Sequence, residues 1–310
     1  MPRYALTFEE LRFYREKGYV LVHDFLSPEE LELWRRGVDA AVVERGPLGG
    51  GAVRLPVAHP NQENADADVQ SWKVPPSVEP SSYEKVFTQR LNLWMTNTIM
   101  RQLMLDPALG EMVGTLASEH LPSPVDGMRI WHDQTLIKEP WGNPTAWHID
   151  NPNWSYTHAG AISMWVALDD ATMRNGALHF IPNSHKEAEL GRTAGGFGDM
   201  NKIFDDYPEW AGRTADLIEL PAGGASFHSG MIAHAAGANM TPSRRRAMTC
   251  AYMPDGSTFN GKQNVLPTPY FETLTVGDVL EDDWINPLIW HRDKSRVLST
   301  AKIPAAMAKI

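Results

Sequence analysis

The chain has 310 residues, a formal net charge of −10 and a single cysteine. One cysteine can neither form a disulfide within the chain nor complete an iron–sulfur or zinc-finger site, so the disulfide-stapled class is excluded. The acidic balance disfavours a nucleic-acid partner, because proteins that bind a phosphate backbone usually concentrate lysine and arginine. A run of about 18 apolar residues is absent, and the N-terminus lacks the apolar stretch of a signal peptide. We therefore expect a cytoplasmic, enzyme-sized protein without a membrane partner, built as one domain.

Helix and strand signals alternate in the first third of the chain. A capping box predicts a helix over 7–18, and the β-branched and aromatic run 19–22 predicts a strand. A second capping box, with proline at the first helical position, predicts a helix over 27–45. The glycine-rich and polar stretch 46–70 is typical of a long functional loop, a candidate lid. Apolar residues over about 90–120 recur at helical spacing.

Short apolar runs separated by glycine, proline and asparagine dominate the middle of the chain. They predict strands at Met128 to Lys138, Ala161 to Leu168, Ala177 to Pro182, Asp216 to Leu220, Ala225 to Phe227 and Arg246 to Met253. Several short strands without intervening helices predict a mainly β fold with flanking helices: a sandwich, jelly roll or barrel. We expect a helical N-terminal support and loop (1–125), a β core (126–254) with a possible second lid at 186–215, and a C-terminal loop and tail (255–310).

The most informative motif is Trp147-His148-Ile149-Asp150. On a strand, positions i and i+2 point to one face, so His148 and Asp150 would converge. Two histidines and one carboxylate form the facial triad of non-haem Fe(II) oxygenases, which leaves coordination positions free for substrate and O₂. The remaining ligand must come from downstream. The candidates are His158, His179, His185, His228 and His234. His291 and Asp293 have the same spacing, but no later histidine completes a triad there.

Three consecutive arginines, Arg244 to Arg246, open an apolar run. In a strand, Arg245 faces opposite to its two neighbours, so one of the two faces can point into the fold while the other stays in solvent. A buried arginine needs an anion, and its planar fork suits a carboxylate. A dicarboxylate cosubstrate would supply that anion.

Together these motifs resemble the phytanoyl-CoA dioxygenase family of Fe(II)/2-oxoglutarate oxygenases. The resemblance covers about Thr7 to Pro254 and is carried by the stretches Gly18 to Val22, His132 to Pro140, Trp147 to Asp150, Trp165 to Ala171, Asn175 to His185 and His234 to Asn239, followed by the arginines. It implies a double-stranded β-helix core, a cupin-like jelly roll, with N-terminal helices. It also implies Fe(II) as cofactor, with 2-oxoglutarate and O₂ as cosubstrates.

The resemblance also selects among the candidate residues. It implies the metal ligands His148, Asp150 and His234, with His228 as an accessory residue and Ala236 where the family has serine. It implies that the cosubstrate is bound by Arg245, Trp165, His132, Gln134 and Thr145. The carboxylate of Asp150 argues against the related halogenases, which have glycine or alanine at that position.

Residues beside the ligand motif are expected to contact a small organic substrate with an apolar body. They are Trp147, Asn153, Trp154 and Tyr156. The implied reaction oxidises an unactivated C–H bond and releases succinate and CO₂, with hydroxylation expected and desaturation or cyclisation as alternatives. The rival readings are a cupin-like metal enzyme that does not use 2-oxoglutarate, and a non-catalytic small-molecule binding protein on the same scaffold. The tail from residue 279 is expected to cover the site or a partner subunit, such as a second copy in a homodimer.

Overall fold

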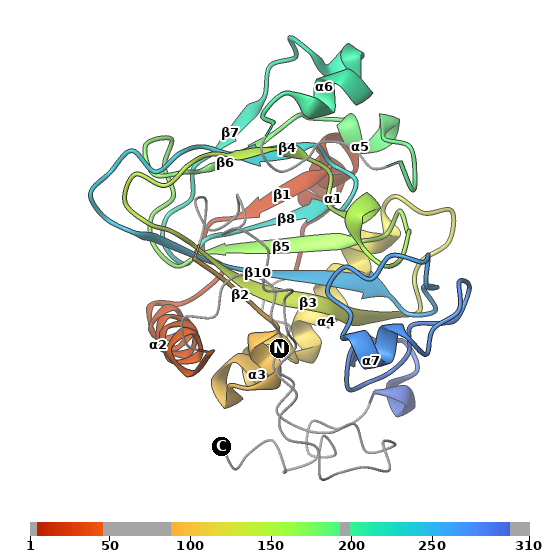
Figure 1. Cartoon of the computed structure of the whole chain (residues 1–310). Coiled ribbons are helices and arrows are strands. Elements are labelled where there is room, and N and C mark those ends of the chain that lie inside the picture. Colours follow the sequence, from red (N-terminus) through yellow and green to blue (C-terminus); the bar gives the residue numbers. More distant parts are fainter. Residues whose placement is uncertain (1–4, 46–87, 193–198, 298–310) are drawn as a thin grey trace.

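The computed structural model describes residues 5–45, 88–192 and 199–297, which form a mainly β fold (Figure 1). A 7-stranded antiparallel sheet has the order β1-β8-β5-β10-β3-β11, with β2 also paired to β3, and a 4-stranded sheet has the order β4-β9-β6-β7. The strands of the large sheet are β1 (Tyr19–Val22), β2 (Thr88–Leu91), β3 (Gly127–Lys138), β5 (Ile162–Ala167), β8 (Ala225–Ser229), β10 (Arg245–Pro254) and β11 (Leu288–His291). Those of the small sheet are β4 (Thr145–His148), β6 (Leu178–Phe180), β7 (Asp216–Ile218) and β9 (His234–Ala236).

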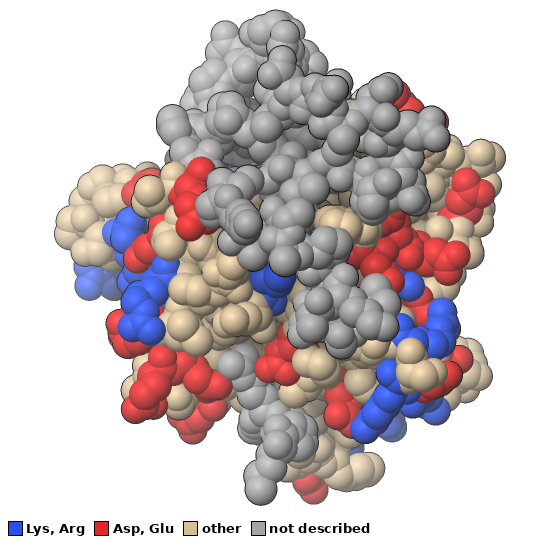
Figure 2. All heavy atoms as spheres, turned by 90° about the horizontal axis from the view of Figure 1, so that it is seen from below, with Lys and Arg blue, Asp and Glu red and all other residues tan. Residues whose placement is uncertain are grey.

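Helices pack on one face of the large sheet (Figure 1). They are α1 (Phe8–Lys17), α2 (Pro28–Arg45), α3 (Thr98–Met104) and α4 (Pro107–Ser118). The capping box predicted for α1 is present, because the Thr7 hydroxyl accepts from the Glu10 backbone and the Glu10 carboxylate accepts from the Thr7 backbone. No helix among the described residues is long and apolar enough to cross a membrane. On the face drawn in Figure 2, acidic and basic side chains are intermixed among the described residues.

The predicted strands are all confirmed, but the stretch 90–120 is not one helix. Leu91 belongs to β2, which pairs with β3, and a 3₁₀ turn, η1 (Leu93–Met95), separates β2 from α3. Asn97 and Asp106 then cap two separate helices by accepting hydrogen bonds from the backbone. Tertiary pairing with β3 therefore overrides the local helical spacing around Leu91.

The insertion after β6 folds into short helical turns. They are α5 (Ser184–Glu187), α6 (Lys202–Asp206) and η3 (Pro208–Trp210). Ile203, Tyr207 and Trp210 are buried in a cluster with Ile149 and Met231, beside the ligand motif. The part of this insertion over 193–198, and the loop predicted at 46–70, lie outside the described residues.

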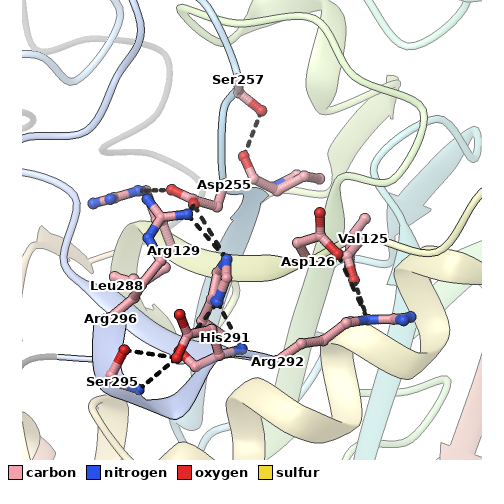
Figure 3. A network of polar contacts seen from close by, with 12 residues as sticks. Val125, Asp126, Arg129, Asp255, Ser257, Leu288, His291, Arg292, Ser295 and Arg296 are labelled. Atoms are coloured by element: carbon pink, nitrogen blue, oxygen red, sulfur yellow. Dashed lines mark hydrogen bonds and ion pairs between the residues drawn. The ribbon is translucent and has the colours of Figure 1, made fainter.

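The chain after β10 returns to the edge of the large sheet. A short helix, α7 (Thr268–Phe271), precedes β11, which pairs with β3 and is followed by η4 (Lys294–Arg296). A polar network holds this segment, in which Arg129 of β3 binds Asp255 at 2.6 Å (Figure 3). Arg129 also binds Asp283 at 2.7 Å. The Asp293 backbone donates to His291 Nδ1, so this second His-x-Asp motif closes a turn. Up to residue 297, the tail therefore packs on the sheet edge.

Candidate metal centre

Strand pairing brings two histidines together. His148 ends β4, His234 begins β9, and the two residues are direct partners in the antiparallel register, with ring centroids 4.1 Å apart. Asp150 lies just beyond β4, at the residue that precedes the 3₁₀ turn η2 (Asn151–Asn153). It is thus outside the strand expected for it, yet it converges with the histidines. One ligand atom from each of the three residues lies within 4.8 Å of the others.

Backbone carbonyls orient both imidazoles. The Nδ1 of His148 lies 2.8 Å from the carbonyl of Ala146, and the Nδ1 of His234 lies 3.1 Å from that of Ile232. Each Nδ1–H therefore donates to the backbone, which leaves the lone pair of Nε2 available for a metal. These Nε2 atoms lie 3.5 and 3.8 Å from the Asp150 Oδ1 atom.

The Asp150 carboxylate is held from its other side. The Ser163 hydroxyl donates to Oδ2 at 2.7 Å, and His228 Nε2 lies 3.7 Å from the same oxygen. Burial alone would raise the pKa of Asp150, but the neighbouring histidines, His234 first, outweigh burial and hold that pKa well below its usual range. Burial lowers the pKa of His234 to about 3. The carboxylate is thus ionised and His234 neutral at pH 7, the protonation states that a metal cation requires.

A cavity of about 270 Å³ opens beside these three residues. Arg245 lines it and is 1% exposed, and among the described residues its Nε and Nη1 have no hydrogen-bond partner. The guanidinium carbon lies 5.2 Å from the centre of the Trp165 ring. Burial lowers the pKa of Arg245 to about 10, so the side chain stays cationic at pH 7. A buried cation with unpaired donors fits an anionic ligand.

The strand register orders the cavity wall from one end to the other. His132 of β3 and Ser163 of β5 are both partners of Ala251 in β10, so they lie in the row that reaches Asp150. One row toward Arg245, Gln134 and Trp165 are both partners of Thr249. The wall therefore runs from the three converging side chains to the arginine. A dicarboxylate that chelates a metal with one end would extend along the same line and bring its other end to Arg245.

The cavity lining includes most of the residues singled out from the sequence. Besides the three converging residues it includes His132, Gln134, Thr145, Asn153, Trp154, Trp165 and Arg245. Trp147 and Tyr156 are not part of it. Trp147 packs against Phe204 of the insertion, while Tyr156 is fully buried and its hydroxyl donates to the carbonyl of Tyr252.

Other lining residues carried no signal in the sequence. They are Gln89, Leu91, Ser163, Met164, Leu178, Ala235, Thr249, Cys250, Ala251, Asn264 and Val265. Gln89 and Leu91 come from β2, whose pairing is long-range, and Asn264 and Val265 come from the loop after β10. Among the alternative histidines, His185 packs against His120, with ring centroids 4.6 Å apart.

Residues 14–247 match the model of the phytanoyl-CoA dioxygenase (PhyH) family, which is more than half of the chain. The chain belongs to this family. Phytanoyl-CoA dioxygenase 1 of Oryza sativa subsp. japonica is 26% identical over 291 residues, covering 87% of this chain and 99% of that protein. A probable alpha-ketoglutarate-dependent hypophosphite dioxygenase of Stutzerimonas stutzeri is 22% identical over 252 residues, covering 79% of this chain and 77% of that protein.

Solved structures show the same fold. The non-haem alpha-ketoglutarate-dependent carbocyclase SnoK from nogalamycin biosynthesis superposes with a TM-score of 0.69 at 24% identity, covering 93% of this chain and 98% of that one. EctD from S. alaskensis, with 2-oxoglutarate and 5-hydroxyectoine, gives a TM-score of 0.62 at 17% identity, covering 88% and 86%. This family member has a jelly-roll fold and is an Fe(II)/2-oxoglutarate-dependent dioxygenase, with iron as cofactor and 2-oxoglutarate and O₂ as cosubstrates.

Proposed function

We propose that this dioxygenase oxidises an unactivated C–H bond of a small organic molecule, with hydroxylation as its reaction. In this proposal His148, Asp150 and His234 hold Fe(II), and Arg245 binds the far carboxylate of 2-oxoglutarate. The observation that carries it is one cavity with a converging His-Asp-His set and, farther along its wall, a buried arginine with two nitrogens unpaired in the described part of the chain. The donor set of two nitrogens and one oxygen fits a non-haem iron centre.

Each residue has a definite task in this proposal. Iron, when bound, supplies the oxidising chemistry, in which 2-oxoglutarate and O₂ are consumed and succinate and CO₂ are released. Ser163 keeps the Asp150 carboxylate in place through its 2.7 Å hydrogen bond. Trp165 covers the guanidinium of Arg245 and shields it from water. Gln134 and Thr145 offer hydrogen bonds along the cosubstrate, and His132 does so in the row of the metal ligands.

The substrate side of the cavity supports a small molecule. A cavity of about 270 Å³ lies just below the usual range for ligand sites, which is about 300–1,000 Å³. Asn153 and Trp154, three and four residues after Asp150, offer one amide and one aromatic wall. We therefore favour a free small molecule over an acyl-CoA thioester. A methylphosphonate hydroxylase of Gimesia maris, whose named substrate is also small, is 23% identical to this chain over 253 residues.

Anaerobic spectroscopy tests the metal and cosubstrate assignments without knowledge of the substrate. Fe(II) plus 2-oxoglutarate should give a weak visible charge-transfer band in the unaltered protein, and His234→Ala should abolish it. His179→Gln is the matched control, because His179 is on β6, the neighbour of β9, and does not line the cavity. A folded protein without the band would contradict the proposal and favour a cupin-like enzyme that does not use 2-oxoglutarate. A band that survives in His234→Ala would reassign the remaining ligand.

A further inference from the structure

Two segments that are far apart in the chain form one wall of the cavity beside the metal ligands. The stretch that follows Asp150 contributes Asn153 and Trp154 to the lining. The loop after β10 contributes Asn264 and Val265. Both contributions lie outside the strands, so the shape of this wall depends on how the two segments are held together.

Hydrogen bonds join the two segments at several points. The backbone of Asn260 donates to the Ser155 carbonyl at 2.8 Å, and the Asn260 side chain donates to the Trp154 carbonyl at 3.0 Å. The Ser155 hydroxyl donates to the Gln263 carbonyl at 2.9 Å. The residue before Asn264 is therefore anchored to the segment that carries Trp154. Such an anchored wall is preorganised, which lowers the entropic cost of binding a ligand.

Asn264 has a backbone conformation that few side chains adopt. It is the second residue of a turn in which the Leu266 backbone donates to the Gln263 carbonyl at 2.9 Å, and its φ is 44°. Glycine adopts this left-handed region most readily, and asparagine is among the side chains best tolerated there. Asn264 is exposed, and its carboxamide makes no hydrogen bond to another described residue. The turn thus presents an available carboxamide to the cavity.

Asn153 and Trp154 add a second carboxamide and an apolar ring. The side-chain nitrogen of Asn153 donates to the Ile149 carbonyl at 2.8 Å, which leaves the side-chain oxygen available to accept from a ligand. The Trp154 ring is 5% exposed and lies 5.6 Å from the ring of Tyr156, centre to centre. One aromatic ring and two carboxamides suit a molecule with an apolar body and neutral hydrogen-bonding groups.

The charges of the lining are already used in the proposed function. Among the described residues that line the cavity, Asp150 is the carboxylate and Arg245 is the guanidinium. With Fe(II) and the doubly charged 2-oxoglutarate bound, these charges cancel. An ionised group of a substrate would lose its hydration without gaining an opposite charge from these residues, whereas a carboxamide can satisfy a neutral polar group.

We propose that the substrate is an uncharged molecule with a ring-sized apolar body and hydroxyl or amide groups, and that Asn153 and Asn264 are the specificity-determining residues that bind those groups. Trp154 packs against the apolar body. The proposal rests on the proposed function, because it takes Asp150 and Arg245 as paired with iron and 2-oxoglutarate.

Three probes of the same shape and different charge test this chemistry. Benzamide is uncharged, benzoate is an anion and benzamidine is a cation at neutral pH. Each is added to the anaerobic Fe(II) protein saturated with 2-oxoglutarate, and the iron-induced relaxation of the probe's NMR signals measures binding beside the metal. Protein loaded with diamagnetic Zn(II) gives the baseline. We expect benzamide to bind with a dissociation constant on the order of millimolar, and the two charged probes on the order of tenfold more weakly.

Variants of Asn264 test the role of its side chain. Asn264→Gly keeps the backbone conformation and removes the carboxamide, so benzamide should bind about fivefold more weakly. Asn264→Asp keeps the shape and adds a negative charge, so benzamidine should gain on the order of tenfold in affinity and benzoate should lose a similar factor. Asn183→Gly is the matched control, because Asn183 also has a positive φ, 68°, but does not line the cavity. Its probe affinities should equal those of the unaltered protein.

The outcomes separate this proposal from the function on which it rests. A charged probe that binds as tightly as benzamide, or benzamide that shows no iron-induced relaxation in a protein with the charge-transfer band, would overturn the substrate class and leave the function intact. Unchanged probe affinities in both Asn264 variants would overturn the role of Asn264, whose side chain would then serve only the turn. Absence of the charge-transfer band in the folded, unaltered protein would overturn both the function and this proposal.

Discussion

Arg245 and Arg246 are neighbours in sequence but use their charges in opposite ways. Arg246 points away from the cavity and binds Asp169 through two nitrogens, at 3.0 and 2.8 Å, and Asp39 at 2.8 Å. Arg245, on the other face of β10, has two nitrogens without partners in the described structure. Strand alternation was sufficient to predict this division. The partnership of Arg245 with Lys138 could not be predicted, because the register between β3 and β10 joins segments about a hundred residues apart.

At the same scale, Arg245→Met should separate ligand binding from stability. Removing the charge-assisted pair with the 2-oxoglutarate carboxylate should weaken its binding on the order of 100-fold, a cost of about 3 kcal/mol. The ligand-free protein should not become less stable, since an unpaired buried charge is itself costly. Arg246→Met is the matched control. It should keep the affinity for 2-oxoglutarate but lose about 2 kcal/mol of unfolding free energy. Calorimetry and chemical denaturation measure the two quantities, and unchanged affinity in Arg245→Met would refute the role of that residue.

At the scale of elements, α1 is attached to the β core through packed rings. Gly18 follows α1, and a Cβ at this position would lie 2.4 Å from His185 Nδ1, so the imidazole fills the space that glycine leaves. His185 packs on His120, which in turn lies 4.7 Å from the ring of Tyr14 in α1. Burial lowers the pKa of His120 to about 3 and that of His185 to about 4. The junction of α1, α4 and α5 is therefore built for neutral imidazoles.

This junction predicts loss of stability in acid. In the unfolded chain both histidines have an ordinary pKa near 6.5, so below about pH 6.5 the unfolded state binds more protons than the folded one. Stability is therefore complete above pH 6.5 and falls as pH drops toward 4, by up to about 1.4 kcal/mol per pH unit for each histidine. Chemical denaturation of the metal-free protein at pH 7 and 5 measures the slope.

The double variant His120→Asn, His185→Gln should show a shallower slope than the unaltered protein. His23→Gln provides the control, because His23 is exposed. Equal slopes for the double variant and the unaltered protein would show that these histidines do not cause the acid sensitivity.

At the scale of the whole molecule, the strands and cavity residues that could not be predicted from the sequence are those that depend on long-range strand pairing. The long strands β3, β5 and β10 and the His148–Asp150 motif are local patterns, and these were predictable. β4, β9 and β11 have only three or four residues each, and their strand conformation is stabilised by pairing with neighbouring strands. The same holds for the cavity wall, where Gln89 and Asn264 arrive from segments far from the ligand motif. Family resemblance implies His234 as a ligand, and its pairing with His148 gives that prediction a geometric basis.

The packing of β11 against α4 leads to a prediction about the global stability of the protein. Gly110 of α4 faces this strand, and a Cβ there would lie 2.5 Å from Trp290 Cβ and 3.1 Å from Ile289 Cγ1. The position of Trp290 Cβ is set by the backbone of β11, so side-chain rotation cannot relieve this overlap. Gly110→Ala should destabilise the protein by about 1–2 kcal/mol, because overpacking outweighs the gain in helix propensity of about 1 kcal/mol. Thr115→Ala, on the exposed side of the same helix, gains propensity without overlap and should be neutral or stabilising. Chemical denaturation compares the two, and a stabilised Gly110→Ala would mean that β11 is not held against α4.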